Sequence, residues 1–381
     1  MAIGRSPPLR TASKYPPHFP AVNYEQQDAT FGDAFSILQK SIGSHVFPAA
    51  SVSIIFRGKM VALKGLGRFT YQADSPNVTD ETIFDLASVS KVVATTAMAM
   101  ILYERGLLDL DMPVTTVIPE FARKDSRKKV VTFRMLLAHS SGLPAYEKLF
   151  LKAQSRDDLV AAAFEMTLTA VAGTRVEYSD IGFIILGIAL ERIADQTLDH
   201  FCQGEIFGRL GMARTAFNPA SNWRRSVAPT ADDRTFRKRV IQGEVQDENA
   251  SVMGGVAGHA GVFSTAEDLA IFAHAILRGG GPLTRPETIA LFTRRESAPP
   301  RTSRALGWDT PSAMSQSGKY FSPGSFGHLG YTGTSLWIDP ERELSITLLT
   351  NRTWPDCNHQ GIREARPRFH DAVVEALEGQ A

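Results

Sequence analysis

The spacing of apolar positions changes from helical to strand-like near the start of the chain. Large apolar side chains first recur every three or four residues: Phe31, Phe35, Leu38 and Ile42. This period predicts an amphipathic helix that ends near Gly43. Two β-rich runs follow at residues 51–56 and 60–66, and the turn residues around Gly58 between them predict a hairpin.

The middle of the chain has a mostly helical pattern, which extends from Ser88 to about residue 293. The expected helix starts, where a polar side chain can cap the first turn, are Thr132, Ser155 and Ser264. Three later β-rich runs predict strands: 305–308, 335–338 and 344–349. A final helical period predicts a helix over residues 363–377.

Strands at both ends of a helical middle predict an α+β fold, with one antiparallel sheet flanked by helices and an inserted, mostly helical subdomain. The expected parts are a Pro-rich N-terminal arm (1–24), a sheet domain (25–84 and 296–381) and the helical subdomain (85–295). We expect a functional cleft where the last two meet. The segment 220–247 lacks clear periodicity and is interpreted as a long excursion over the surface.

Composition narrows the possible functions. The 41 Lys and Arg residues nearly cancel the 40 Asp and Glu residues, so no global field favours nucleic acid. Cys202 and Cys357 are far apart and lack metal-ligand spacing, which argues against a disulfide framework or a zinc site. The longest apolar runs are too short to span a membrane. No secretory signal is visible, so the chain as written is expected in the cytoplasm, or in the periplasm or outside the cell if a leader was removed.

A serine and a lysine stand three residues apart at the start of an apolar helical run. This spacing places the Lys91 amine on the same helix face as the Ser88 hydroxyl, and the helix N-terminus adds positive potential. A desolvated lysine can titrate low enough to act as a base, so the pair could form an activated nucleophile. Taken alone, the pattern is more often that of a helix cap with a surface lysine.

Two further segments add candidate chemistry. Tyr178 stands where a short strand is expected to break into an apolar helix, so its hydroxyl can point into a cleft. The segment 326–334 enters a predicted hairpin and contains Gly330, whose small size would let a substrate approach the backbone. The alternatives are a core tyrosine with a satisfied hydroxyl and glycines that serve only turns.

Together with the stretches 136–144, 258–265 and 337–340, these segments resemble the β-lactamase-like serine hydrolases. The similarity extends over about residues 28–351 and is greatest to class C β-lactamases, low-molecular-weight DD-peptidases and family VIII carboxylesterases. It implies a β-lactamase/transpeptidase-like fold and an acyl-enzyme on Ser88. It also implies a base formed by Lys91 and Tyr178, and an oxyanion hole formed by the backbone N–H groups of Ser88 and Tyr331.

The sequence departs from the family pattern at two positions. Asp180 replaces the asparagine of the family's Y-x-N pattern, which puts its usual contact with substrate in doubt. His328-Leu329-Gly330 replaces K-T-G, so the lysine that holds a substrate carboxylate is absent. We therefore expect an esterase or D-amino-acid peptidase of penicillin-binding-protein type, with weak or no β-lactamase activity. Protonation below the usual histidine pKa of about 6.5 would partly restore carboxylate binding.

The open alternatives are a true β-lactamase and a non-catalytic sensor related to the penicillin-binding proteins. An α/β-hydrolase using Ser140 is set aside, because its G-x-S-x-G pattern begins with Ala138 and no strand precedes it. Gly142 is interpreted as a helix C-cap.

The remaining candidates concern the walls of the cleft. Tyr146 and Trp308 are residues that could line it or pack in the core. His259 is interpreted as a structural neighbour, since Lys91 and Tyr178 already supply a base. No metal or organic cofactor is required, and the expected ligand is a small ester, amide or peptide. The oligomeric state stays open.

Overall fold

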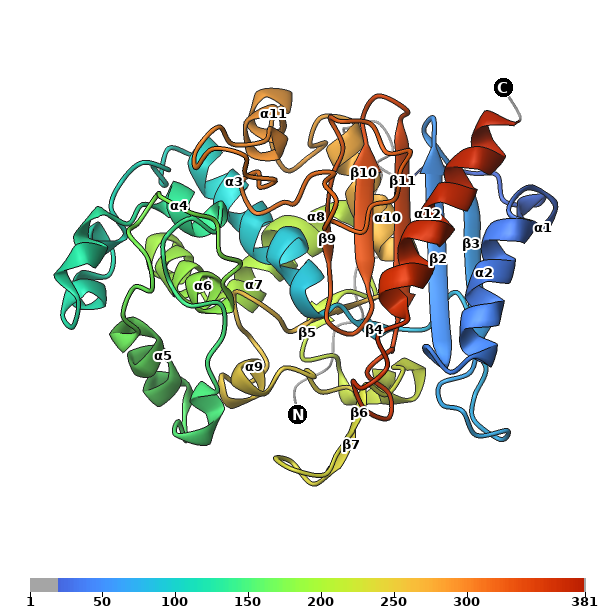
Figure 1. Ribbon diagram of the computed structural model, residues 1–381, viewed down its shortest axis with the longest axis horizontal. Helices are drawn as coiled ribbons and strands as arrows, with labels where there is room; N and C mark the ends of the chain where they lie inside the picture. The colour runs from blue at the N-terminus through green and yellow to red at the C-terminus, as the bar shows by residue number, and fades with distance from the viewer. Residues whose placement is uncertain (1–19, 380–381) are drawn as a thin grey trace, which may run out of the picture.

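The computed structural model describes residues 20–379 and contains a six-stranded sheet (Figure 1). Most of the predicted Pro-rich arm, residues 1–19, lies outside the described residues. The strands, in their order across the sheet, are β1 (Ala21–Val22), β3 (Lys59–Gly67), β2 (Ala49–Phe56), β11 (Leu344–Thr350), β10 (Ser335–Asp339) and β9 (Phe326–Leu329). Neighbouring strands are antiparallel except β1 and β3, which are parallel.

The N- and C-terminal parts of the chain share this sheet through the pairing of β2 with β11. The register places Ser53 opposite Thr347 and Ala50 opposite Thr350. Both central strands are almost wholly buried, which agrees with their continuous apolar runs. The predicted antiparallel α+β fold is therefore confirmed.

Helices cover both faces of the sheet. On one face, α2 (Gly32–Gly43) and α12 (Ile362–Glu378) pack against each other and form a core with the sheet (Figure 1). On the other face, α10 (Ala266–Leu277) contacts β2, β10 and β11. This second core continues into the helical part of the molecule, so the large apolar cluster extends from the sheet to the helices.

The helical part lies to one side of the sheet, with α3 and α6 near its centre (Figure 1). The remaining helices are α1 (Gln27–Thr30), α3 (Ala97–Glu104), α4 (Phe133–Leu137), α5 (Arg156–Glu165), α6 (Asp180–Ala194), α7 (Leu198–Cys202), α8 (Gly208–Leu210), α9 (Glu248–Val252) and α11 (Pro286–Thr293). Two small sheets complete the fold: β4 (Phe84–Asp85) with β8 (Val262–Ser264) and β5 (Ala216–Phe217), and β6 (Ala231–Asp233) with β7 (Arg239–Ile241). Within residues 20–379, no helix has the length and apolar character that a bilayer crossing requires.

Most of the predicted elements are present at the predicted places. The first helix, the first hairpin, the strands after residue 334 and the final helix agree with the structure within a few residues. Two predicted caps are confirmed, because Thr132 accepts a hydrogen bond from the Met135 N–H and Ser155 accepts one from the Asp158 N–H.

Two predictions about elements are wrong. The apolar run 305–308 forms no strand. Its flanking residues make only isolated bridges, Arg304 with Asp309 and Asp309 with Gly327, and Trp308 is buried in the core. The cap of α10 is Thr265 instead of Ser264, which ends β8 and hydrogen-bonds with Thr215.

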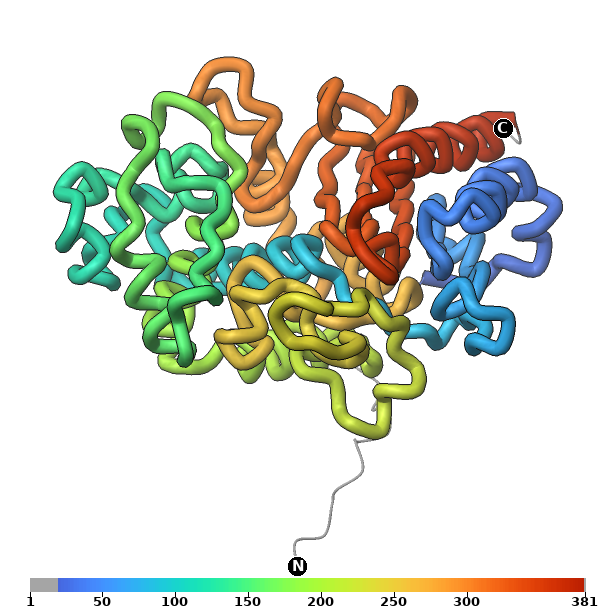
Figure 2. The backbone as a smooth tube through the Cα atoms, turned by 60° about the horizontal axis from the view of Figure 1, so that its bottom comes forward, coloured from blue at the N-terminus to red at the C-terminus, as the bar shows by residue number. Residues whose placement is uncertain are grey.

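One further sequence interpretation, the Gly142 cap, needs correction. The left-handed residue after α4 is His139, with φ of 55°, instead of Gly142, and the Ser140 N–H closes the end of the helix on the Met135 carbonyl. The segment 220–247 runs along the edge of the molecule, as expected, and contains the β6–β7 hairpin (Figure 2). Its last two residues, Gln246 and Asp247, line the large cavity described below.

Candidate active site

Ser88 lies in a strained turn between the small sheet and the apolar helix. The 3₁₀ turn Ala87–Val89 follows β4, and Ala87 has a left-handed φ of 47°, which is unfavourable for a residue with a Cβ. The Asp85 carboxylate holds this turn by accepting a hydrogen bond from the Ala87 N–H at 2.8 Å. A wider π turn, Lys91–Thr96, then leads into α3.

Lys91 is fully buried beneath Ser88 and makes three hydrogen bonds. Its Nζ donates to Ser88 Oγ at 2.9 Å, to Asp180 Oδ1 at 2.6 Å and to the His259 carbonyl at 3.0 Å. These bonds use all three donors of an ammonium group. Burial alone would lower the pKa of Lys91, but the charges of Asp180 and Tyr178 raise it. The expectation that this lysine titrates low is therefore wrong, and Lys91 is a cation at neutral pH.

Tyr178 lies directly over this lysine at the start of α6. Its ring centroid is 4.9 Å from Lys91 Nζ, and its hydroxyl lies within hydrogen-bonding reach of the Lys91 and Ser88 side chains. The ring of His139 lies beside it at 4.5 Å and accepts a hydrogen bond from the Ser179 N–H, which orients the neighbouring backbone. Burial raises the pKa of Tyr178, while the Lys91 charge acts in the opposite direction.

The turn after β9 is fastened to the segment that carries Ser88. Thr332 Oγ1 donates to the Asp85 carbonyl and Thr334 Oγ1 to the Leu86 carbonyl, each at 2.8 Å. A Cβ on Gly330 would collide with Thr334 and Leu86, so this close approach requires glycine. In the part of the chain that the structure describes, the Tyr331 N–H makes no hydrogen bond. It is therefore free to donate to a substrate oxygen.

His328 is buried and uncharged. Its Nδ1 hydrogen-bonds with the Leu329 carbonyl at 2.8 Å, and its ring lies 5.9 Å from that of Tyr178. Burial, with the positive charges of Lys91 and Arg304, holds the pKa of His328 well below its usual range. The expected gain of a positive charge just below pH 6.5 is therefore wrong.

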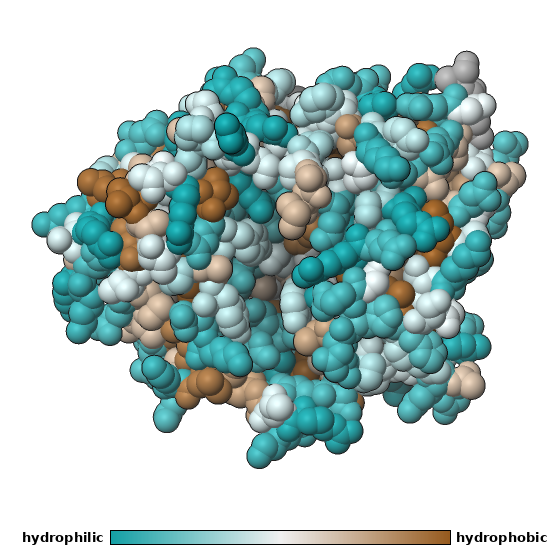
Figure 3. Space-filling model, in the orientation of Figure 1, coloured by the Kyte–Doolittle hydropathy of each residue, from teal (hydrophilic) through white to brown (hydrophobic). Residues whose placement is uncertain are grey.

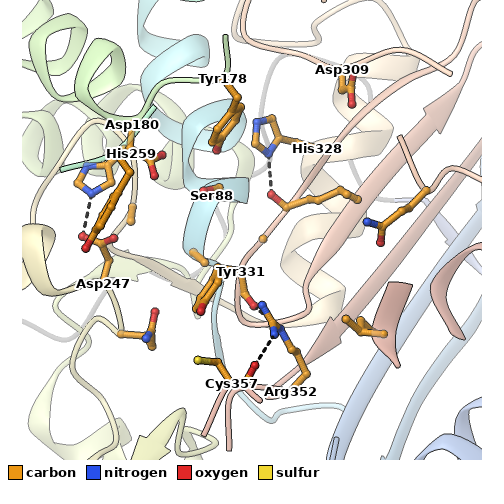
Figure 4. Close-up of a pocket in the computed structure, with 18 of the residues that line it drawn as sticks. Ser88, Tyr178, Asp180, Asp247, His259, Asp309, His328, Tyr331, Arg352 and Cys357 are labelled. Atoms are coloured by element: carbon orange, nitrogen blue, oxygen red, sulfur yellow. Dashed lines mark hydrogen bonds and ion pairs between the residues drawn. The ribbon is translucent and has the colours of Figure 1, made fainter. Parts of the chain in front are cut away.

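These side chains meet in a cavity of about 780 Å³, which opens near the middle of the face in Figure 3 and is seen in detail in Figure 4. The sequence-predicted residues that line it are Ser88, Tyr146, Tyr178, Asp180, His259, His328, Gly330 and Tyr331. Lys91 lies beneath its floor. Trp308 does not line the cavity, because it is fully buried and packs edge-on against Phe326 at 5.1 Å.

Sequence reasoning missed several residues of this cavity. Asp247 accepts a hydrogen bond from His259 at 2.8 Å, so the two side chains form a hydrogen-bonded histidine–aspartate pair (Figure 4). Arg304 lines the wall 3.7 Å from Asp309. Arg352, Arg363 and Arg366 line another end. No motif marks these positions, because charged residues on loops and helix ends look like ordinary surface residues in a sequence.

A serine, a lysine and a tyrosine meet in the cleft between an antiparallel sheet and a helical region. This arrangement defines a serine hydrolase of the β-lactamase/transpeptidase type. The chain belongs to the Beta-lactamase family, whose model matches residues 32–366.

Individual proteins agree with this assignment. The chain is 31% identical to an N-acetylmuramyl-L-alanine amidase of Bacillus subtilis (strain 168), over 80% of this chain and 77% of that protein. It is also 31% identical to a putative D-alanyl-D-alanine carboxypeptidase of Escherichia coli (strain K12), over 78% of this chain and 76% of the relative. The fold matches EstCE1, described as a hydrolase with promiscuous acyltransferase activity. The TM-score is 0.74 at 21% identity, covering 91% of this chain and 99% of EstCE1.

Proposed function

We propose that this serine hydrolase forms an acyl-enzyme on Ser88, with Tyr178 as the general base and Lys91 as a fixed positive charge. The observation that carries the proposal is the contact among these three side chains on the floor of the cavity, with Lys91 Nζ 2.9 Å from Ser88 Oγ. A nucleophile in contact with a base that a third group orients is the arrangement that acyl transfer needs.

The direction of the hydrogen bonds supports these roles. Because Lys91 donates to Ser88 Oγ, the serine's own proton is left to bond with the Tyr178 oxygen. As Ser88 attacks a carbonyl carbon, the phenolate form of Tyr178 takes this proton and later returns it to the leaving group. The Lys91 charge favours the phenolate form that accepts the proton, although burial raises the pKa of Tyr178. Water then releases the acyl group by the reverse proton path.

The backbone N–H groups of Ser88 and Tyr331 are the proposed oxyanion donors. Two such donors, held before the reaction, stabilise the negative charge that develops on the carbonyl oxygen. The threonine hydrogen bonds that join residues 332 and 334 to residues 85 and 86 hold the two donors in one rigid frame.

We further infer that esters and peptide amides are better substrates than β-lactams. A neutral His328 supplies no cation at the position where the resembling enzymes hold the β-lactam carboxylate with lysine. Loss of a charge-assisted hydrogen bond costs about 1.5–3 kcal/mol, or roughly ten- to a hundredfold in rate. The names of the amidase and carboxypeptidase relatives favour a peptide as the second substrate class to examine.

The test is a panel of p-nitrophenyl butyrate, nitrocefin and a D-Ala-D-Ala peptide, with Ser88→Ala and Ser140→Ala as matched variants. We expect ester or peptide turnover that falls by several orders of magnitude in Ser88→Ala and survives in Ser140→Ala. A fluorophosphonate adduct should map to Ser88 by mass spectrometry. Labelling of Ser140, or nitrocefin turnover equal to that of the ester at pH 8, would contradict the proposal. A chain that binds such ligands without turning any over would favour the sensor alternative.

A further inference from the structure

Three arginines line the end of the cavity beside Tyr331. They are Arg352, which follows β11, and Arg363 and Arg366 in the first turns of α12. Arg352 and Arg366 are only 6% and 3% exposed. Among the ion pairs within residues 20–379, none includes any of the three. The cavity end therefore carries positive charge without a carboxylate partner.

The two buried guanidinium groups are held by neutral oxygens. Arg352 donates from Nε to the Tyr331 carbonyl at 2.7 Å and from Nη1 to the Cys357 carbonyl at 3.4 Å (Figure 4). Arg366 donates to Gln316 Oε1 at 2.5 Å and to the Thr334 carbonyl at 3.3 Å. Arg366 Nε is buried and has no partner in the described part of the chain. Buried charges are ordinarily paired, because removing an ion from water is costly.

The arginines also repel one another. Burial and the charge of Arg352 lower the pKa of Arg366 to about 9, and burial together with Arg363 lowers that of Arg352. The positive N-terminal end of α12 adds to the same potential. An anion at this point would relieve the repulsion and provide the missing partner.

Other charges of the cavity do not compete for this role. Arg304 lies close to Asp309, and Asp247 pairs with His259 away from Arg352 (Figure 4). Glu248 also lines the cavity, but it forms no ion pair with any of the three arginines in the described chain. Figure 4 shows Arg352 beside Tyr331, at the end of the pocket away from Tyr178 and His328. The uncompensated charge is therefore displaced from position 328.

We propose that Arg352, Arg363 and Arg366 form a subsite for a carboxylate carried by the substrate, displaced from position 328. This inference rests on the proposed hydrolase function and specifies its substrate class. The planar guanidinium group matches a carboxylate with two parallel hydrogen bonds, so arginine suits this role. A flexible chain that carries its carboxylate some distance from the scissile carbonyl can reach the subsite. A rigid β-lactam, whose carboxylate belongs near residue 328, cannot use it in the same way.

The experiment compares pairs of esters in which one member carries a free carboxylate and the other its methyl ester. Mono-(4-nitrophenyl) glutarate and its methyl ester place the charge in the acyl part. The butyrate esters of 4-hydroxybenzoate and of methyl 4-hydroxybenzoate place it in the leaving group. We expect kcat/KM for the anionic member of at least one pair to exceed that of its neutral partner. The ratio should fall about tenfold or more in Arg366→Gln and in the exposed variant Arg363→Gln.

Arg368→Gln is the matched control, because Arg368 belongs to the same helix but pairs with Glu364 and is largely exposed. Its ratio should equal that of the wild type. Equal ratios in the wild type and both test variants, beside normal turnover of the neutral esters, would overturn the subsite and leave the hydrolase proposal intact. Absence of turnover with every ester and with the D-Ala-D-Ala peptide would overturn the hydrolase proposal itself. Competitive inhibition by glutarate, weakened in Arg363→Gln but not in Arg368→Gln, gives an independent binding measurement.

Discussion

Asp180 determines the charge of the residue beneath the proposed nucleophile. In the resembling enzymes an asparagine stands at this position, and here the carboxylate accepts a 2.6 Å hydrogen bond from Lys91. Its charge raises the pKa of Lys91 and also that of Tyr178. The aspartate at position 180 therefore changes the pKa of the proposed base, Tyr178, in addition to replacing the asparagine that contacts substrate in the resembling enzymes.

Asp180→Asn should shift the acidic limb of the activity profile to lower pH. Removing the negative charge lowers the pKa of both Lys91 and Tyr178, so the ionised tyrosine becomes accessible in more acidic solution. The measurement is kcat/KM for p-nitrophenyl butyrate against pH in both proteins. An unmoved limb, or one that moves to higher pH, would contradict this account of the base.

Lys91 and Tyr178 should behave as one functional unit. Lys91→Ala, Tyr178→Phe and the double variant are expected to lose similar amounts of kcat, because the Lys91 charge acts through the ionisation of Tyr178. A double-mutant cycle on ester hydrolysis measures this. Losses that multiply in the double variant would show two independent roles and remove Tyr178 from the base.

His328 should not act as a pH switch for substrate choice. Because its pKa lies well below the usual value, the ring stays neutral between pH 8 and pH 6. The ratio of nitrocefin to p-nitrophenyl butyrate turnover should therefore remain constant over this range, within about twofold. The two rates are measured in the same buffers, so changes in the shared catalytic groups cancel. A ratio that rises as the pH falls toward 6 would mean that His328 takes up a proton after all.

At the scale of elements, α10 carries a buried carboxyl group that makes the stability pH-dependent. Asp268 accepts hydrogen bonds from the Arg214 N–H and the Thr215 hydroxyl, yet burial raises its pKa from 3.8 to about 6. The folded state therefore prefers the neutral form. Its stability falls as the pH rises from about 4 through 6, because the unfolded chain ionises first.

Asp268→Asn removes this dependence. Relative to the wild type, the variant should gain stability between pH 4.5 and pH 7.5, by roughly 1–3 kcal/mol at the upper end. Urea unfolding of both proteins at several pH values measures the difference in their free energies of unfolding. All other titrating groups contribute equally to the two proteins, so their effects cancel in this difference. A difference that is constant with pH would show that the Asp268 pKa is ordinary.

At the scale of the whole molecule, side chains far apart in the sequence join the sheet to the segment of Ser88. The Thr334 hydroxyl bonds with the Leu86 carbonyl across 248 positions, inside the core. This contact holds the proposed oxyanion donors at the junction of the two regions. It is a consequence of tertiary packing alone.

Thr334→Val should therefore lower both stability and kcat. The variant keeps the side-chain shape but removes one of the two hydrogen bonds to the buried Leu86 carbonyl, which retains the Val89 N–H, at a cost of about 0.5–1.5 kcal/mol. Thermal unfolding and ester kinetics are the measurements. Thr347→Val is the control, because Thr347 is also buried in the sheet and its hydroxyl has no partner in the described chain. Equal behaviour of the two variants would show that the Thr334 hydrogen bond does not position the site.

The sequence by itself determined the elements and the candidate nucleophile. The local spacing of apolar residues was sufficient to predict α2, the first hairpin and α12, because burial of one face of an element imposes a regular spacing. The strand predicted at 305–308 was wrong, since a short apolar run looks the same in a strand and in a buried loop. Order and spacing of motifs were sufficient to identify the family that the comparisons show.

Only the tertiary structure decided the charges within the site. Asp180 raises the pKa of Lys91, burial keeps His328 neutral, and the arginines of α12 and of the end of β11 meet without a carboxylate partner in the described chain. These are properties of distance and desolvation between residues far apart in the sequence. A linear pattern carries no information on either quantity, which is why charge states and the arginine cluster escaped sequence reasoning.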